Sequence, residues 1–247
     1  MKTFIVENGI NGILSALFIS FSEKIFPDSV EDEKLYQPRL DGVNIKIATN
    51  IQNAERVKKA LFKYGGDDII AHLRVCLSSC DSRALTYAFN YGYLTLKQRT
   101  DVSKNLSEKF VSDFSYIVQK VLHERHILTG MLRFAESSSG VLYARYSPDN
   151  DVTSILAPHF LKRLGHTPFI IHDVKRGKIA ISNGRAIKID FTDLPPTFTP
   201  SENEEKLKAL WRKYYNKINI EERKNPRQQD GYFPRRYRQY CFETYEC

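Results

Sequence analysis

The sequence predicts an α+β fold, a mainly helical chain with a small antiparallel sheet packed against helices. Apolar residues recur every three or four positions through much of the first half, as in amphipathic helices, whereas short alternating runs divided by Gly-containing turns gather in residues 131–189. The 42% hydrophobic and 27% charged residues are typical of a globular protein and exclude a disordered, collagen-like or disulfide-scaffold chain. We therefore expect a single domain of residues 1–247 with a helical subdomain at residues 50–130.

The first half of the chain is expected to be helical after two short strands. The strands are predicted at residues 3–6 and 43–47, and the second alternates Val43, Ile45 and Ile47 with polar residues. The acidic stretch between Pro27 and Pro38 is expected to be a loop. Helices are expected at residues 10–21, 51–64, 67–77, 82–96 and 107–129.

The second half is expected to hold the sheet. A hairpin is predicted around the turn at residues 136–140, followed by a helix at residues 151–164 that Gly165 closes. Further strands are expected at residues 169–172, 178–181 and 186–189. A Pro-rich connector, residues 192–201, then leads to C-terminal helices within residues 202–247. The first of these helices is expected to direct Leu207, Leu210, Trp211 and Tyr214 inward.

Positive charge is concentrated in two stretches of the chain. The net charge is +8, yet residues 120–185 hold 10 basic and 5 acidic side chains, and residues 223–238 hold six basic ones against Asp230 alone. Such clustering favours contact with a polyanion, because neutralised phosphates release condensed counterions. A solvated basic surface without nucleic acid is the alternative. The residues expected to contact nucleic acid are Arg133, Arg163, Lys175, Arg176, Arg223, Arg227, Arg235, Arg236 and Tyr237.

Four side chains are the candidates for acid–base or metal chemistry: Glu124, His126, His172 and Asp173. Glu124 and His126 lie in His-Glu-Arg-His, which differs from the HExxH zinc motif because its two His are three positions apart. A helix-end charge pair is the alternative for this segment. His172 and Asp173 end a predicted strand, where Asp173 can equally well start a turn. No metal site is expected.

Several classes of protein are excluded or disfavoured. The chain lacks a phosphate loop, a GxSxG elbow and a GxGxxG fingerprint, and no cofactor is expected. Four Cys residues are too sparse for a disulfide framework and favour a reducing cytoplasm. The longest apolar runs are interrupted and fall short of the ~20 residues of a membrane span.

Over nearly the whole chain, and most clearly at residues 121–176 and 205–243, the sequence resembles an uncharacterised bacterial family associated with DNA metabolism or DNA repair. The resemblance rests on Glu124, His126, Gly130, Arg133-Phe134, Pro148-Asp149, Pro158-His159-Phe160, Arg163, Ile171-His172-Asp173, Arg176, Leu210-Trp211, Tyr214-Tyr215, Ile220, Glu222-Arg223, Asn225-Pro226, Gln228, Pro234 and Arg236-Tyr237. It implies a gene neighbourhood with a radical-SAM protein, and related domains fused to uracil-DNA glycosylase-like domains. The glycosylase and CxxxCxxC motifs are absent from this chain, so those activities would belong to a partner.

The leading hypothesis is therefore a cytoplasmic, DNA-binding accessory protein of a repair or modification system, acting with a radical-SAM partner. One alternative is a metal- or acid/base-dependent enzyme acting on nucleic acid or nucleotides, which requires Glu124 and His172 to approach one another. The other is a protein-interaction adaptor without nucleic-acid contact.

Overall fold

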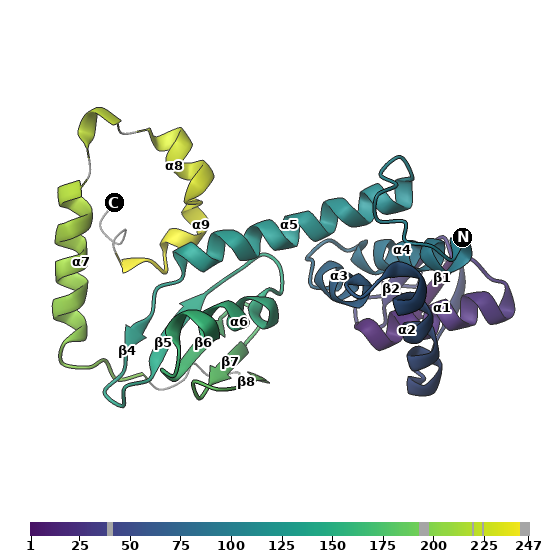
Figure 1. The fold of residues 1–247 in the computed structure, drawn as a ribbon, viewed down its shortest axis with the longest axis horizontal. Coiled ribbons are helices and arrows are strands. Elements are labelled where there is room, and N and C mark those ends of the chain that lie inside the picture. Colours follow the sequence, from purple (N-terminus) through teal and green to yellow (C-terminus); the bar gives the residue numbers. More distant parts are fainter. Residues whose placement is uncertain (39–41, 193–197, 219, 224, 243–247) are drawn as a thin grey trace. The chain divides into compact units, whose positions relative to one another are not determined.

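The chain divides into two compact units, residues 1–122 and 123–247, in a computed structural model (Figure 1). The structure describes residues 1–38, 42–192, 198–218, 220–223 and 225–242. The boundary falls within helix α5, Lys109–Met131. The single domain expected from the sequence stays a prediction. Residues 193–197, half of the predicted Pro-rich connector, lie outside the described residues.

The first unit is built on a three-stranded sheet in which every strand is parallel. β1 (Lys2–Val6) lies in the middle, between β2 (Ser29–Asp32) and β3 (Val43–Lys46). Helix α1 (Ile10–Glu23) connects β1 to β2, and a parallel pair needs such a crossover. The helices that follow are α2 (Ile51–Gly65), α3 (Ile69–Leu77) and α4 (Ala84–Gln98).

The sequence-based prediction of this sheet was incomplete. Both expected strands and the expected helices are present, but residues 29–32, predicted as loop, form β2. The acidic residues of this segment concealed its strand pattern, because only Val30 of its four side chains is fully buried. The segment is held by its register with β1 and by Thr86, whose hydroxyl accepts a hydrogen bond from the Val30 backbone N–H at 2.9 Å.

The second unit contains a five-stranded sheet that is mixed rather than antiparallel. Its order is β4 (Ala135–Glu136), β5 (Leu142–Tyr146), β6 (Phe169–Asp173), β7 (Lys178–Ser182) and β8 (Ile187–Phe191). β5 and β6 pair in parallel because α6 (Thr153–Leu164) crosses over between them, whereas the other neighbours are antiparallel. The prediction of an antiparallel sheet is therefore wrong for the pairing of β5 with β6 and correct for the other three pairings of this sheet.

The core of the second unit lies between α6 and one face of this sheet. Phe160 of α6 and Phe169 of β6 are buried, and Phe134 contacts both rings edge-on, with centroid distances of 5.0 and 6.0 Å. Along β6, Phe169, Ile171 and Asp173 share this face, while Ile170 and His172 point to the other, because successive strand residues alternate.

The C-terminal segment comprises α7 (Glu204–Ile218), a short 3-10 helix (Glu221–Arg223), α8 (Pro226–Tyr232) and α9 (Arg235–Arg238). The start of α7 is attached to the sheet, since buried Glu204 accepts a hydrogen bond from the Glu136 backbone N–H at 2.8 Å. The other end returns to α5, where the Cys241 thiol donates to the Met131 carbonyl. Nowhere in the described part of the chain does a helix have the length and apolar character needed to cross a membrane.

Candidate functional site

Glu124 is a buried carboxylate surrounded by donors. It lies on α5 and is 5% exposed. Its Oε1 accepts from the Asp149 backbone N–H at 2.7 Å and from the Tyr237 hydroxyl, and its Oε2 accepts from the backbone and side chain of Asn150 at 2.9 and 2.6 Å. Four hydrogen bonds satisfy both carboxylate oxygens. Glu124 therefore joins three segments of the second unit: α5, the loop after β5 and α9.

A second buried carboxylate, Asp173, lies at the end of β6. Its Oδ1 accepts from the backbone N–H groups of Lys175 and Arg176, and its Oδ2 pairs with the Arg176 guanidinium at 2.9 Å. The same guanidinium donates to the carbonyls of Pro148 and Asp149. Burial raises the pKa of the Asp173 carboxyl above its usual value, and the hydrogen bond from Arg176 opposes that rise.

The two carboxylates belong to one polar network, which we call the Glu124 cluster: Glu124, Asp149, Asn150, Asp173, Arg176, Arg236 and Tyr237. Asp149 connects them, because its backbone contacts both Glu124 and Arg176, and its side chain pairs with Arg236 at 3.2 Å. Burial and the bond to Glu124 raise the pKa of the Tyr237 hydroxyl, so it remains a donor. The arrangement is suited to fastening α9 onto the unit.

The other two candidate catalytic groups lie elsewhere. His172 is 4% exposed on the opposite face of the sheet from Asp173, and its Nδ1 is hydrogen-bonded to the Tyr143 hydroxyl at 2.9 Å. Burial lowers the pKa of His172 below its ordinary 6.5. His126 is exposed on α5. The structure thus brings together Glu124 and Asp173 but not His126 or His172, and the approach of Glu124 to His172 that the enzyme hypothesis required is not observed.

The described residues contain no group of three or more His, Cys, Asp or Glu side chains that could hold a metal ion. Near Tyr143, a groove of about 200 Å³ is lined by the Ser137–Ser139 turn and Phe198. It presents hydroxyls and apolar surface without a charged group.

Most cations predicted to contact nucleic acid already have partners within the protein. Arg163 and Arg133 donate to the carbonyls of Thr129 and Gly130, which the last turn of α5 leaves without a helical partner. Arg176, Arg235 and Arg236 pair with Asp173, Asp230 and Asp149. The ammonium of Lys175 and the guanidinium groups of Arg223 and Arg227 have no partner among the described residues and are exposed.

Tyr237 corrects the prediction in a different way. It was expected to face nucleic acid, but it is 2% exposed, and its ring is covered where the hydroxyl reaches Glu124. The residue pattern could not decide between the two roles, because aromatic residues interleaved with Arg are equally typical of a stacking surface and of a structural anchor.

One family matches the chain: a domain of unknown function, DUF4130, over residues 82–243. This match covers more than half of the 247 residues. The protein belongs to the DUF4130 family. No curated protein matches the chain. The DUF4130 region contains the Glu124 cluster and the whole of α7, whereas the parallel sheet of the first unit precedes it.

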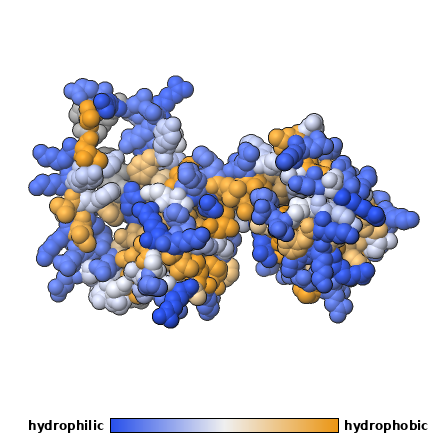
Figure 2. All heavy atoms as spheres, viewed as in Figure 1, coloured by the Kyte–Doolittle hydropathy of each residue, from blue (hydrophilic) through white to orange (hydrophobic). Residues whose placement is uncertain are grey.

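Within the DUF4130 region, α7 shows an arrangement that the sequence analysis missed. The side chains expected to point inward are exposed by 40–64%, and with Ile218 they form one stripe at helical spacing: Leu207, Leu210, Trp211, Tyr214 and Ile218. The side of α7 that faces the protein is polar instead. There Glu204 is buried, and Arg212 donates to the Phe242 carbonyl at 3.0 Å. Figure 2 shows hydrophobic residues at the surface along this helix, among hydrophilic ones.

A row of lysines borders this stripe. Three lysines lie along one edge of the stripe: Lys206 and Lys213 are four and three positions from Leu210, and Lys217 is three positions from Tyr214. All three are exposed, and their ammonium groups have no partner among the described residues. At Trp211 the Arg133 guanidinium lies 6.0 Å from the ring centroid. The inward polar residues Glu204, Lys208 and Arg212, spaced four apart, were the available signal for this orientation.

Proposed function

We propose that this protein is an accessory protein that docks a partner protein through the apolar stripe of α7. The supporting observation is the exposure of five large apolar side chains on one side of a helix whose internal contacts are made by polar residues outside this stripe. A single exposed apolar residue is ordinary, but a continuous stripe on a helix is typical of a surface that another protein covers. The proposal corresponds to the adaptor hypothesis from the sequence.

The charge around the stripe defines the chemistry of the partner. Three lysines without partners would remain beside the interface, so the fitting surface is an apolar groove with an acidic rim. The radical-SAM protein implied by the family resemblance is the candidate that we propose for this role. Trp211 and Tyr214 lie at the centre of the stripe and are the residue types that most often dominate binding energies.

The experiment measures the affinity of the purified full-length chain for the radical-SAM protein of the same genome by calorimetry. Leu210→Glu places a charge in the middle of the stripe and should weaken binding by about a hundredfold or more, a cost of roughly 3 kcal/mol. Ala209→Glu is the matched control, because this exposed neighbour lies off the stripe on the same helix; it should leave the affinity nearly unchanged.

Three outcomes oppose the proposal. Equal affinities for Leu210→Glu and Ala209→Glu would show that the stripe is not the interface. Tighter binding by Lys213→Glu would exclude an acidic rim. If light scattering showed that the wild-type chain is a dimer and that the Leu210→Glu variant is a monomer, the stripe would be the interface with a second copy of this chain. Nuclease treatment of the samples ensures that nucleic acid does not bridge the proteins.

Nucleic-acid binding is the second candidate function, favoured by the unpaired cations that continue beyond α7. Arg223 and Arg227 follow Lys206, Lys213 and Lys217 along one segment, and Tyr232 nearby is 79% exposed. We propose this segment, rather than Arg176, Arg235 or Arg236, as the contact surface. Cations already paired with carboxylates must lose those partners before they can bind phosphate, whereas unpaired ones need not.

Fluorescence anisotropy of a labelled single-stranded oligonucleotide, measured at several salt concentrations, tests this candidate. Neutralising Arg223 and Arg227 together should lower the slope of log affinity against log salt by about 0.7 for each lost phosphate contact. Neutralising Lys59 and Lys104, two exposed cations of the first unit, is the control. An unchanged slope in the first variant, or no binding at low salt, would oppose nucleic-acid contact by this segment.

A further inference from the structure

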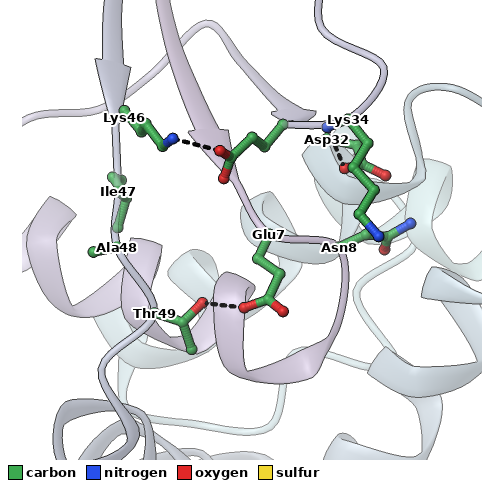
Figure 3. Close-up of a pocket in the computed structure, with 9 residues that line it drawn as sticks. Glu7, Asn8, Asp32, Lys34, Lys46, Ile47, Ala48 and Thr49 are labelled. Atoms are coloured by element: carbon green, nitrogen blue, oxygen red, sulfur yellow. Dashed lines mark hydrogen bonds and ion pairs between the residues drawn. The ribbon is translucent and has the colours of Figure 1, made fainter.

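A groove in the first unit lies where its three parallel strands end together. β1 ends at Val6, β2 at Asp32 and β3 at Lys46. Residues at these ends and just beyond them, 7–8, 32–34 and 46–49, line a space of about 580 Å³ (Figure 3). Small-molecule sites in proteins commonly have volumes of roughly 300–1,000 Å³. In open parallel sheets, ligands bind outside the carboxyl ends of the strands. This edge precedes the DUF4130 match, so the family assignment does not cover it.

Contacts between the chain segments give the groove a defined shape. Glu33 donates its backbone N–H to the Val6 carbonyl, and Ile47 donates to the Ile5 carbonyl, so the flanking segments stay beside β1 past the strand ends. At the base, the Thr49 hydroxyl donates to Glu7 Oε2 at 2.9 Å. The ion pair of Lys46 with Glu33 links the ends of the two outer strands.

The remaining polar groups combine acceptors with one cation. Asp32 uses Oδ1 to accept the Lys34 backbone N–H at 3.0 Å, and no described residue occupies its Oδ2. The Lys34 ammonium and the Asn8 amide also have no partner among the described residues. A carboxylate oxygen accepts hydrogen bonds from hydroxyls, and an ammonium pairs with a phosphate. The groove therefore suits a ligand that carries both groups.

The connection from β1 to α1 narrows the ligand class further. Close packing requires glycine at position 12, since a Cβ there would lie 2.1 Å from the Glu7 carbonyl oxygen. At Gly9, by contrast, no atom would lie within 4 Å of an added Cβ. α1 therefore starts directly behind β1, and open space lies beside its N-cap residue, Gly9. An acidic residue at the end of the second strand, about 20 residues after such a Gly turn, contacts ribose in nucleotide-binding sheets. Asp32 occupies that position.

We propose that this groove binds a ribonucleotide, with the Asp32 carboxylate accepting a ribose hydroxyl and the Lys34 ammonium pairing with the phosphate. The argument rests on the groove, on the two groups without partners and on the position of Asp32, and not on a complete fingerprint, because the β1–α1 connection has Gly9 and Gly12 but lacks the GxGxxG pattern. The site is independent of the α7 stripe and of nucleic-acid contact by residues 206–227. It would give an accessory protein a nucleotide-responsive unit.

Calorimetric titration of the full chain with AMP, 2′-deoxy-AMP and adenosine tests the site. AMP should bind saturably, 2′-deoxy-AMP about tenfold more weakly because it lacks the hydroxyl for Asp32, and adenosine more weakly because it lacks the phosphate. Asp32→Asn should weaken AMP binding by about tenfold and abolish the preference for the ribose form. Lys34→Ala should weaken AMP binding while leaving adenosine binding unchanged.

Controls separate a lost contact from a lost fold. Glu23→Gln and Lys59→Ala remove an exposed carboxylate and an exposed ammonium of the same unit away from the groove, and both should bind AMP like the wild type. Circular dichroism verifies that Asp32→Asn folds, and Lys34→Ala provides a second variant that leaves the backbone contact of Asp32 intact. The proposal is overturned by the absence of saturable AMP binding at millimolar concentration, by equal affinity for AMP and 2′-deoxy-AMP, or by unchanged AMP affinity in both groove variants.

Discussion

Glu124 shows how a residue with apparent catalytic promise can be structural. A carboxylate near two His residues invites an acid–base interpretation. Here, however, each oxygen of Glu124 accepts two hydrogen bonds, and the four donors belong to three residues in total. With two donors at each oxygen, the carboxylate has no lone pair left to direct at a substrate. Its partners come from positions 25, 26 and 113 residues away. It therefore fixes long-range contacts of the second unit.

Tyr237→Phe tests this structural role. The substitution removes only the hydroxyl, so Glu124 Oε1 keeps the Asp149 N–H but loses its second donor inside the protein. The free energy of unfolding, measured by urea denaturation, should fall by about 1.5–3 kcal/mol, as for a hydrogen bond to a charged group. Tyr232→Phe, at a 79% exposed position, should change it by less than about 0.5 kcal/mol. Equal small effects of the two variants would contradict a stabilising Glu124 cluster.

His172 should make the stability of the protein depend on pH. Its pKa is lowered by burial, so between its folded value and the ordinary 6.5 the unfolded chain binds more protons than the folded one. The stability linked to His172 is therefore fully present above pH 6.5 and is lost as pH falls toward the folded pKa. His172→Gln should reduce the drop in Tm between pH 7.5 and pH 5, which thermal melts at both values measure.

His126→Gln is the control for that experiment. His126 is exposed on α5, away from the buried His172, so this substitution should leave the pH dependence of stability unchanged. If both His variants retain the wild-type pH dependence, burial of His172 does not contribute to acid destabilisation.

At the scale of elements, the first βα connection depends on one close approach. α1 passes directly behind β1, and Gly12 has no room for a side chain because a Cβ would lie 2.1 Å from the Glu7 carbonyl oxygen. Backbone atoms cannot yield as the end of a flexible side chain can. This contact positions both the start of α1 and the carboxyl edge of β1 beside the groove.

Gly12→Ala should therefore destabilise the protein although alanine is the better helix former. We expect the free energy of unfolding to fall by more than about 2 kcal/mol, well beyond the propensity gain of up to about 1 kcal/mol. Gly130→Ala is the matched control, because this α5 glycine would place its Cβ in open space. It should be neutral or stabilising in the same denaturation assay. A neutral Gly12→Ala would show that α1 can move away from β1 without cost.

α7 illustrates the limit of amphipathic patterns. Its apolar spacing correctly predicts a helix, but the face carrying Leu210 and Tyr214 lies outward, and Glu204 and Arg212 make the internal contacts. A hydrophobic stripe indicates that a helix has a covered face in its functional state, not that the same chain covers it. The position of the neighbouring elements decides whether such a stripe is packed in the core or lies at the surface.

At the scale of the whole molecule, the two compact units should respond independently to local damage. Gly12 and Tyr237 belong to different units, and their contacts lie within their own units. The destabilisation of Gly12→Ala and of Tyr237→Phe should add in the double variant to within about 0.5 kcal/mol. Urea denaturation of the four chains measures this. A coupling energy above about 1 kcal/mol would show that the units stabilise one another.

The sequence by itself determined the helices, most strands and the α+β class, because these follow from local periodicity and from turn signals such as Gly165. It also located the polar residues that matter structurally, since Glu124, Asp173 and Arg176 all lie in one network. Only the tertiary structure decided their roles. Whether a cation pairs with a carboxylate of the same chain, and whether an apolar stripe lies in the core or at the surface, depends on residues distant in the sequence.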